Sequence, residues 1–460
     1  MIDEIEVEHD RDEDAYILDK RDVLAILEAV ESHDAMLLTE LMAPLHAADI
    51  ADLLEQIDED ERRALVQLYG REFDGNILSE LDDGIRDEVI QYLHPEVLAE
   101  AVRDLESDDV VDLLEDLDQQ LQQAVLGALE DADRVAVEQA MSYPEYSAGR
   151  LMQREVVMGP DYWTVGEAID FLRASEDLPS EFYHLILVNP RLEPVGYVTL
   201  GRLLSSRREI KLMEIAEDSF RSFEVDEEEG DVAYAFNQYH LISAPVVDST
   251  GRLVGVITID DAMSVLDEEH EEDILRLAGV GDGSLSDKVI ETTKQRLPWL
   301  AVNLVTAIAA SLVIAQFEAT ISAFVALAVL MPIIASMGGN AGTQALTVAV
   351  RAIATRDLTG SNVWRVIRRE AMVGLANGLI FATLMGVVGV VWFGIPLLGL
   401  VIAAAMIINL VVAGLSGIGI PVFLERLGID PALASGAFVT TVTDVVGFFA
   451  FLGLAAMVLF

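Results

Sequence analysis

Between Glu318 and Arg351 the sequence contains no ionisable side chain: ATISAFVALAVLMPIIASMGGNAGTQALTVAV (residues 319–350). As one straight helix these 32 residues would extend about 48 Å, well beyond the ~30 Å hydrocarbon core of a bilayer. Three glycines and several polar side chains at 337–344 predict a weakened or broken helix there. Backbone of that kind is tolerated at membrane depth only where protein or a water-filled cavity surrounds it.

Apolar stretches on both sides of this run bring the predicted number of membrane spans to five. Residues 297–317 supply one span, residues 371–424 supply two with a turn at 393–396, and residues 431–460 supply the last. Basic residues precede the first span and separate the second from the third and the fourth from the fifth; the other two connections carry none. The positive-inside rule then predicts a multi-pass protein of the cell (inner) membrane, surrounded by lipid, with a cytoplasmic N-terminus and an external C-terminus.

Charge divides the chain sharply. Residues 1–294 carry 73 acidic and 22 basic side chains, whereas the remainder carries six and seven. Such an acidic excess would repel phosphates, which argues against a nucleic-acid partner, but it suits a divalent cation. Halophilic adaptation is an open alternative, since there are four lysines against 25 arginines. The absence of cysteine excludes disulfides and thiolate metal sites, and the acidic N-terminus lacks the apolar run of a cleavable signal peptide.

The acidic part begins with a helical repeat. Leucine and alanine recur at helical spacing through residues 1–145. The segment DIADLLEQID (49–58) matches DVVDLLEDLD (109–118) at an offset of 60, and a weaker copy lies around 77–81. Recurring helix pairs of this kind predict a small all-α superhelical domain.

A second repeat follows, in which valines and isoleucines alternate with turns. The segments LVN (187–189) and PVGYVT (194–199) align with VVD (246–248) and LVGVIT (253–258) at an offset of 59. Each copy is typical of strand, turn, strand and helix, so residues 146–267 predict a pair of α+β modules. A connecting helix at 268–294 would then join this pair to the transmembrane domain at 295–460 and transmit movement between them.

Asp444 is the strongest candidate for a functional residue, because it is the only ionisable residue within the last predicted span. A charge at that depth costs about 2.5–3.5 kcal/mol on insertion scales, so it normally faces an interior or a watery path. The alternative is a structural aspartate paired with a neighbouring helix, but the spans offer no lysine, arginine or histidine for such a pair. Thr440 and Thr441, at i−4 and i−3, share the face of Asp444. Oxygen ligands without cysteine or clustered histidine suit Mg²⁺.

Several motifs together carry a resemblance to a known family. The phrase GRLVGVITIDD (251–261) is highly typical of a tandem CBS module. The membrane half contains GGNAGTQ (338–344), RAIATRD (351–357), DPA (430–432) and TTVTDVVG (440–447). With its order of helical repeat, CBS pair, connecting helix and five spans, essentially the whole chain resembles the MgtE family of magnesium channels.

The resemblance implies a homodimer with a pore along its two-fold axis. Asp444 would hold a hydrated Mg²⁺ ion, and the stretch that includes Thr343 and Thr347 would line the pore beside it. Some relatives have an asparagine two helical turns before the pore aspartate; this chain has Gly436, so only a backbone carbonyl could serve there. Acidic side chains of the soluble regions would bind cytoplasmic Mg²⁺ and close the channel, the candidates being Asp261, Glu269, Glu272 and Asp273.

We therefore predict a Mg²⁺-selective channel or transporter gated by cytoplasmic Mg²⁺, and not an enzyme, with an adenine nucleotide at the CBS pair as a further candidate ligand. The predicted pore-lining residues are Asn340, Thr343, Gln344, Thr347, Gly436, Thr440 and Thr441. Helix–helix packing is the alternative role for the first four, and a solvated face is the alternative for the acidic run 267–273. Two other functions stay open: transport or exchange of another divalent cation such as Co²⁺ or Mn²⁺, and a membrane-tethered CBS sensor that conducts nothing.

Overall fold

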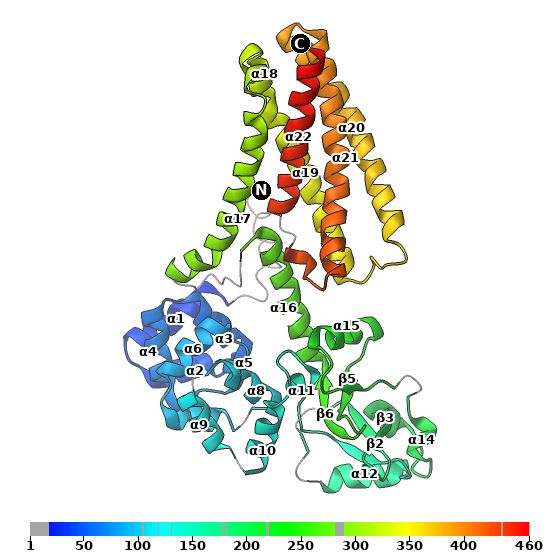
Figure 1. Ribbon diagram of the computed structural model, residues 1–460. Helices are drawn as coiled ribbons and strands as arrows, with labels where there is room; N and C mark the ends of the chain where they lie inside the picture. The colour runs from blue at the N-terminus through cyan, green and yellow to red at the C-terminus, as the bar shows by residue number, and fades with distance from the viewer. Residues whose placement is uncertain are drawn as a thin grey trace, which may run out of the picture. The chain divides into compact units, whose positions relative to one another are not determined.

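The computed structural model describes residues 18–280, 289–433 and 436–459, except for positions 104, 118, 130, 176–177, 180–181 and 218–219. The chain forms two compact units, Met1–Glu268 and Glu269–Phe460 (Figure 1). The expectation about the acidic N-terminus falls on residues 1–17, which lie outside the described residues.

The first unit begins with short amphipathic helices that bury their apolar faces in one core, which includes Leu53, Leu54, Leu78 and Leu114. The all-α character predicted for this region is confirmed. The helices are α1 (Lys20–Glu31), α2 (Ala35–Met42), α3 (Ala47–Gln56), α4 (Glu59–Tyr69), the 3₁₀ turn η1 (Gly70–Glu72), α5 (Asn76–Ser79), α6 (Asp83–Tyr92), α7 (Pro95–Ala101), α8 (Ser107–Asp116), α9 (Gln119–Ala128) and α10 (Asp131–Ala140).

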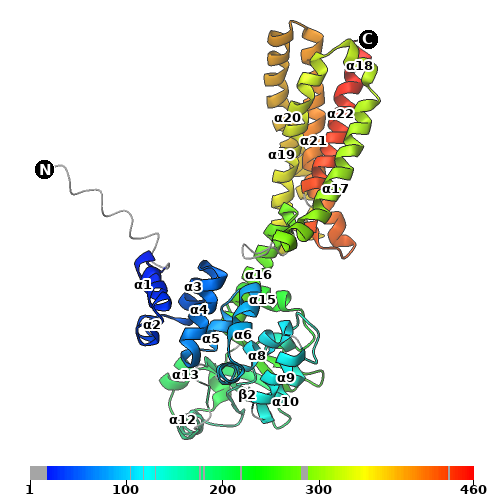
Figure 2. The ribbon, with the colours of Figure 1, turned by 90° about the vertical axis from the view of Figure 1, so that its left-hand side faces the viewer.

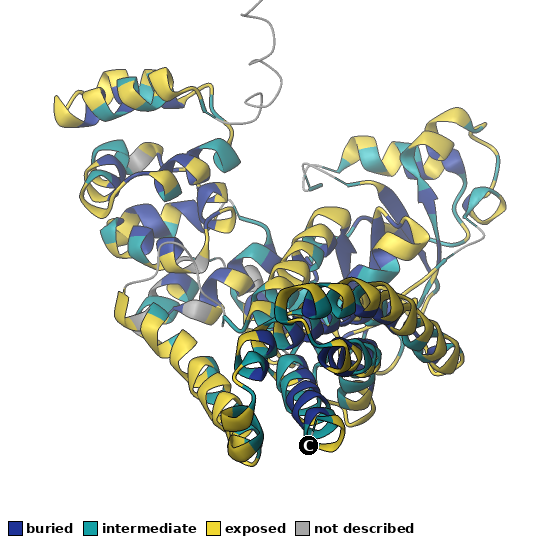
Figure 3. Ribbon diagram, turned by 90° about the horizontal axis from the view of Figure 1, so that it is seen from above, coloured by how far each residue is buried: buried dark blue, intermediate teal, exposed yellow. Residues whose placement is uncertain are grey.

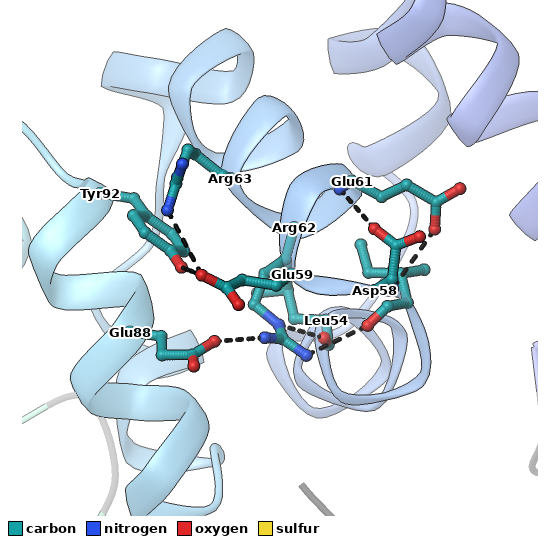
Figure 4. Close-up of polar contacts among 9 residues, drawn as sticks. Leu54, Asp58, Glu59, Glu61, Arg62, Arg63, Glu88 and Tyr92 are labelled. Atoms are coloured by element: carbon teal, nitrogen blue, oxygen red, sulfur yellow. Dashed lines mark hydrogen bonds and ion pairs between the residues drawn. The ribbon is translucent and has the colours of Figure 1, made fainter. Parts of the chain in front are cut away.

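The predicted offset of 60 is visible in the hydrogen bonds between these helices. Arg62 Nε on α4 donates to the Leu54 carbonyl on α3 at 2.7 Å (Figure 4). Sixty residues later, Gln122 Nε2 on α9 donates to the Leu114 carbonyl on α8 at 2.7 Å. The repeated unit is thus a helix pair whose second helix is tied to the end of the first.

Buried guanidinium groups also link one helix pair to the next. The Arg62 side chain is only 7% exposed, and its Nη1 donates to Glu88 of α6 at 2.6 Å. Arg86 of α6 forms the corresponding ion pair with Asp112 of α8 at 2.5 Å. This row of ion pairs fixes α8, which packs against α11 (Ala148–Leu151) at the start of the next region.

Two three-stranded sheets with the same topology follow. In each, the first strand is parallel to the second and the second is antiparallel to the third. A register irregularity falls at equivalent places, Leu187/Val188 and Val246/Val247. The prediction of a pair of α+β modules is therefore confirmed. The elements are β1 (Met158–Pro160), α12 (Val165–Ala174), β2 (His184–Val188), β3 (Pro194–Thr199), α13 (Leu200–Ser205) and α14 (Leu212–Ile215), then β4 (Phe223–Glu224), α15 (Glu229–Tyr239), β5 (Ser243–Val247) and β6 (Leu253–Thr258).

The segment between the helical domain and the first sheet pairs with β6. Gln153 and Val256 exchange two backbone hydrogen bonds, each 2.9 Å long. Gly255 permits this approach, because a Cβ there would stand 2.5 Å from Met152 Sδ and 2.8 Å from the Gln153 carbonyl oxygen. The helical domain is therefore joined directly to the strand that precedes α16.

Helix α16 (Ile259–Ala278) begins immediately after β6. It starts nine residues before the connecting helix expected at 268–294, because Asp261 caps its first turn by accepting from the Thr258 backbone and hydroxyl. It ends at Ala278, and the next residue, Gly279, has a φ of 68°, which glycine adopts easily. The remainder of the expected connection includes residues 281–288, which lie outside the described residues.

The second unit is a helical bundle (Figures 1 and 2). Within the described residues, five helices contain segments long and apolar enough to cross a membrane, as predicted: Thr292–Ala315, Ala326–Ala354, Val363–Phe393, Pro396–Arg426 and Gly436–Val458. The turn expected at 393–396 separates the third from the fourth. The elements are α17 (Val289–Ala315), α18 (Glu318–Ala323), α19 (Ala326–Ala354), α20 (Val363–Phe393), α21 (Pro396–Arg426), the 3₁₀ turn η2 (Pro431–Leu433) and α22 (Gly436–Val458). Buried residues run along α22, which leads to the C-terminus marked in Figure 3.

The predicted break in the second span is wrong, because α19 continues through 337–344. Its glycines serve packing instead. A Cβ on Gly338 would overlap the side-chain amide of Asn409 on α21, and one on Gly342 would stand 2.5 Å from Val439 Cγ1 on α22. Close approach of neighbouring helices requires small residues, so the same glycines that weaken an isolated helix stabilise the bundle.

Candidate ion pathway and acidic groups

The candidate ion pathway is centred on Asp444 of α22. It lies eight residues after Gly436, the first residue of the helix, which is about 12 Å along the axis. Its side chain is partly exposed and forms no hydrogen bond or ion pair with any residue that the structure describes. The alternative of a structural aspartate paired with a neighbouring helix therefore has no partner in the described part of the chain.

Helix α19 presents one buried and one exposed face beside α22. The exposed face carries four of the predicted pore-lining residues: Asn340, Thr343, Gln344 and Thr347. The start of α22 lies against this helix, since a Cβ on Gly436 would stand 3.7 Å from Thr343 Oγ1. One on Gly339 would stand 3.2 Å from Thr440 Cγ2. The structure thus brings Thr343, Gly436 and Thr440 together, and Thr441 and Asp444 follow along α22.

The threonine hydroxyls in this region donate to their own helices. Thr343 Oγ1 donates to the Gly339 carbonyl at 3.0 Å and Thr347 Oγ1 to the Thr343 carbonyl at 3.1 Å. Thr440 and Thr441 donate in the same way, to Gly436 at 2.7 Å and to Ala437 at 2.5 Å. A hydroxyl whose proton is used in this way retains only acceptor capacity. The surface therefore offers oxygen lone pairs, which suit a hard cation or its water shell.

A first group of acids lies in the first unit. Burial, then the charge of Asp261, raises the pKa of Asp109 to about 7. Burial also raises the pKa of Asp108, with further contributions from Asp261 and Asp109. Asp261 itself has a pKa raised by burial to about 6. These three carboxylates are thus close enough to repel one another in their charged forms.

The backbone around this first acidic group is held by neighbouring polar side chains. Gln153 Nε2 donates to Glu106 Oε2 at 2.7 Å, and Ser107 Oγ donates to Glu155 Oε2 at 2.9 Å. Because residues 106–109 belong to the helical domain and Asp261 to α16, the group lies where these two regions meet within the first unit. Repulsion among its carboxylates therefore acts directly on that contact.

A second group of acids lies in the second unit, at the end of α16. Burial, then the charges of Asp430 and Glu269, raises the pKa of Asp273 to about 6. Glu272 forms an ion pair with Arg276 one turn later, so this predicted metal ligand already has an internal cationic partner. The four predicted sensor residues are thus divided, with Asp261 in one unit and Glu269, Glu272 and Asp273 in the other.

The donor set fits a hydrated Mg²⁺ ion better than a dehydrated one. In the described ranges, no three Asp, Glu, His or Cys side chains form a group that could hold a metal ion by themselves. Mg²⁺ dehydrates reluctantly and is usually bound by one or two carboxylates with several waters retained. Asp444, and the carboxylates gathered around Asp261, offer that kind of site.

Sequence reasoning missed Glu106, Asp108 and Asp109 as partners of Asp261. The sequence feature that could have pointed to these residues was the acidic run at 106–109, at the start of a repeat. Nothing in the sequence indicates that this run meets the beginning of α16. Asp430 was quoted as part of a motif, but its proximity to Asp273 and Arg276 was equally unforeseen.

Comparisons with known proteins agree with this architecture. A family model described as a divalent cation transporter matches residues 331–454, one for the MgtE intracellular N domain matches 45–146, and one for the CBS domain matches 218–268. The magnesium transporter MgtE of Thermus thermophilus is 31% identical, over 96% of this chain and 99% of its own length. The corresponding protein of Enterococcus faecalis is 34% identical, over 70% and 71%.

The chain belongs to the MgtE family. The CBS model covers only the second α+β module, and the first is recognised by its matching sheet topology. Among solved structures, the cytosolic domain of the Mg²⁺ channel MgtE in complex with ATP is 27% identical, with a TM-score of 0.49, and covers 53% of this chain and 99% of that one. As a member of the MgtE family with five candidate spans, the chain is a membrane protein.

Proposed function

We propose that this chain forms a Mg²⁺-selective channel in the cell membrane, which closes when cytoplasmic Mg²⁺ binds the acidic groups of its soluble regions. Transport of Mg²⁺ is supported by membership of a family whose curated members are named magnesium transporters. The single observation that carries the proposal is the Asp444 carboxylate, which has no partner in the described part of the chain and lies on a membrane-spanning helix beside threonine oxygens that can only accept.

Conduction in this proposal uses a largely hydrated ion. One Asp444 per chain gives a single negative charge in the path, and a homodimer would place two such charges around one divalent ion. The threonine oxygens of Thr343 and Thr440 would accept hydrogen bonds from its water shell. A site that leaves the waters in place avoids the large cost of dehydrating Mg²⁺ and binds weakly enough for release.

Closure in this proposal comes from the two acidic groups. Without a cation, each of the two groups holds a buried carboxylate whose pKa is raised by burial and by its own neighbours: Asp109 by Asp261, and Asp273 by Asp430 and Glu269. A divalent ion between such carboxylates would replace repulsion by attraction and favour the packed arrangement by population shift. Halophilic adaptation explains acids exposed to solvent, but it gives no reason to bury Asp108 and Asp109 beside Asp261.

Orientation and assembly remain predictions within this proposal. Basic residues Arg351, Arg365, Arg368 and Arg369 lie at the ends of the second and third spans that lead into their connection, which supports a cytoplasmic position for that connection and for the soluble regions. The C-terminus after the fifth span would then be external. An adenine nucleotide at the CBS pair is supported by the presence of both modules.

The first test is magnesium-dependent growth of a transporter-deficient bacterium carrying wild type, Asp444→Asn or Glu318→Gln at matched expression. Glu318→Gln removes a carboxylate of the same unit that lies outside the five candidate spans. The proposal predicts rescue by wild type and Glu318→Gln and failure of Asp444→Asn. Equal rescue by all three would remove Asp444 from the pathway. Failure of all three would favour the CBS sensor or another ion.

The gating part has its own test in the same cells. Asp109→Asn combined with Asp261→Asn removes charge from the first acidic group, and Glu96→Gln removes an exposed carboxylate of the helical domain. The double variant loses both the repulsion between these carboxylates and the ligands for Mg²⁺, so its uptake should respond much less to the change from low to high external Mg²⁺ than wild-type uptake does. Uptake that stops at the same internal Mg²⁺ level as in wild type would contradict this part alone.

A further inference from the structure

Three arginines lie in the first two turns of α20, the third candidate span: Arg365, Arg368 and Arg369. All three side chains are exposed. Their guanidinium groups form no ion pair or hydrogen bond with any residue that the structure describes. These three residues, called the basic surface below, therefore present positive charge that no carboxylate of the described chain neutralises.

The exposed side of α20 becomes apolar directly after the basic surface. Met372, one turn after Arg368, is 57% exposed, and exposed apolar side chains continue along the helix at Leu375, Leu379 and Ile380. An exposed apolar row on a membrane-spanning helix marks the depth of the hydrocarbon. The basic surface therefore lies about one helical turn, roughly 5 Å, from the hydrocarbon, which is the level of the lipid headgroups.

The other side of the same two turns packs against the bundle. Val363 is buried, and Val366 and Ile367 pack with it in one apolar cluster that includes Ile418 and Val422 of α21. This contact fixes the rotation of α20 about its axis. The arginines are therefore held on the side of the helix that faces away from this cluster, on a regular helix and not on a loop.

An exposed tryptophan accompanies the basic surface. Trp364 is 75% exposed, lies next to Arg365 and is four residues before Arg368, so it shares their side of the helix. Tryptophan is enriched at membrane–water interfaces, where its amphipathic ring lies at the headgroup level. Its exposure here places the start of α20 in that layer independently of the apolar row.

Guanidinium groups at this level match the phosphate of a lipid headgroup. A guanidinium presents its donors in a planar fork that binds two phosphate oxygens at once. An anionic phospholipid leaves the phosphate charge free for the arginines, whereas a zwitterionic one carries its own cation beside the phosphate. Carboxylates of the acidic residues 1–294 are the other anions in the chain, but so close to the hydrocarbon their desolvation is costly.

We propose that the basic surface, together with Trp364, binds the headgroup of an anionic phospholipid. The inference goes beyond the proposed transport function and does not depend on it, because it concerns the lipid beside the chain and not the transported ion. An anionic leaflet repels the strongly acidic residues 1–294. Lipid bound at the basic surface supplies an attraction at the same membrane face that opposes this repulsion.

The test uses the two exposed tryptophans of α20 as local probes in liposomes that contain the full-length chain. Trp364 lies beside the basic surface, whereas Trp392 is 63% exposed near the other end of the helix, and the sequence has no basic residue from 370 to 425. Two chains are compared in Mg²⁺-free buffer, each with one of these tryptophans retained and the other three replaced by phenylalanine.

Phosphatidylglycerol or phosphatidylcholine, brominated near the top of the acyl chains, quenches a tryptophan that it contacts. Quenching at several mole fractions gives the binding of the anionic lipid relative to the zwitterionic one at each probe. This ratio at Trp364 should exceed that at Trp392 by about fivefold or more, the effect of one basic side chain near an anionic surface. The excess should decrease as the salt concentration rises. Equal ratios at the two probes would overturn the proposal without any arginine variant.

Replacing the basic surface should remove the preference at Trp364: Arg365→Gln, Arg368→Gln and Arg369→Gln in one chain. The matched control changes the net charge equally in the first unit, at three exposed arginines, and should keep the preference: Arg21→Gln, Arg63→Gln and Arg208→Gln. The corresponding triple lysine variant of the basic surface retains the charge and should retain most of the preference. A preference that survives the triple glutamine variant would contradict the assignment to these arginines.

Glycerol phosphate separates a lipid from a soluble phosphate as the bound group. It carries a phosphate without acyl chains, so it should not displace phosphatidylglycerol from Trp364 at matched concentration. Displacement would show that the surface takes a soluble phosphate and would overturn the assignment to lipid. None of these readouts requires Mg²⁺ transport, so they stay decisive for lipid binding if the proposed channel function is wrong.

Discussion

Asn409 of α21 donates its side-chain amide to the carbonyl oxygen of Ile334 on α19 at 2.8 Å, with no part of its residue surface exposed. Gly338 and Gly447 lie directly against this amide, since a Cβ on either would overlap it or stand 2.9 Å from it. Asn409 therefore joins α19, α21 and α22 at one point. It acts through helix packing, and the glycines around it are required by its volume.

Gly338→Ala is expected to destabilise the bundle by about 1–3 kcal/mol, because the added methyl meets the Asn409 amide. Asn409→Ala should cost about 1 kcal/mol through the lost interhelical hydrogen bond. The double variant should be less destabilised than the sum, since the smaller residue makes room for the new methyl. Thermal unfolding of the purified protein in detergent measures all three. Strict additivity would show that the two positions do not share this space.

Arg62→Met should destabilise the helical domain by about 3 kcal/mol, because it leaves two carbonyl groups and the Glu88 carboxylate without the guanidinium. Arg63→Gln is the control: this neighbour is 47% exposed and pairs with Glu59 at 3.4 Å, so its loss should change stability by less than about 0.5 kcal/mol (Figure 4). Hydrogen exchange of α4 and α6 in the full-length chain reports both. Similar effects of the two variants would contradict the structural role of Arg62.

The first acidic group predicts a pH dependence in Mg²⁺-free buffer. The folded-state pKa of Asp109, about 7, lies above that of an unfolded aspartate, so the folded state binds more protons between about pH 4 and pH 7. The contact between residues 106–109 and the start of α16 should therefore loosen as the pH rises through 7 and tighten as the pH falls. Hydrogen exchange of residues 107–112 between pH 5 and 8, corrected for intrinsic rates, tests this. Asp109→Asn should flatten the curve; a dependence that survives in this variant has another source.

His184 predicts a pH dependence of opposite sign. Burial lowers its pKa to about 4, and its Nδ1 is hydrogen-bonded to the Ser243 hydroxyl at the equivalent position of the second module. The stability that depends on its neutral form is present above about pH 6.5 and is lost as the pH falls from there towards 4. His184→Gln should reduce this acid sensitivity in the CBS pair, measured by the exchange of β2 and β5. An unchanged acid transition would place its origin elsewhere.

Much of the fold could be predicted from the sequence because it depends on local pattern. The apolar lengths predicted five spans, and the absence of charge together with Gly394 and Pro396 located the turn between α20 and α21. The offsets of 60 and 59 predicted repeated units, which the Arg62 and Gln122 hydrogen bonds and the two matching sheets confirm. The prediction of a break at 337–344 was wrong. Glycines weaken an isolated helix, but here they permit close packing against neighbouring helices, and that packing stabilises α19.

The candidate site was harder to predict, because it depends on contacts between distant segments. An ionisable residue within a long apolar run is visible in the sequence, so Asp444 could be found from the sequence alone. The neighbours of Asp261 could not, since nothing local relates the acidic run at 106–109 to the start of α16. The pairing of Arg276 with Asp430 likewise depends on where α16 ends relative to α22. The role of each residue as an ion ligand or sensor stays a prediction.

In the proposed function, Mg²⁺ crosses the membrane past Asp444. Its most direct test is Mg²⁺ entry into liposomes that contain the purified chain and a Mg²⁺-sensitive dye, with wild type, Asp444→Asn and Glu318→Gln compared at equal protein content. Contacts to a charged group are worth about 1.5–3 kcal/mol, so Asp444→Asn should slow entry at least about tenfold while Glu318→Gln remains at the wild-type rate. Entry at the wild-type rate through Asp444→Asn would show that Mg²⁺ does not depend on this carboxylate to cross the membrane.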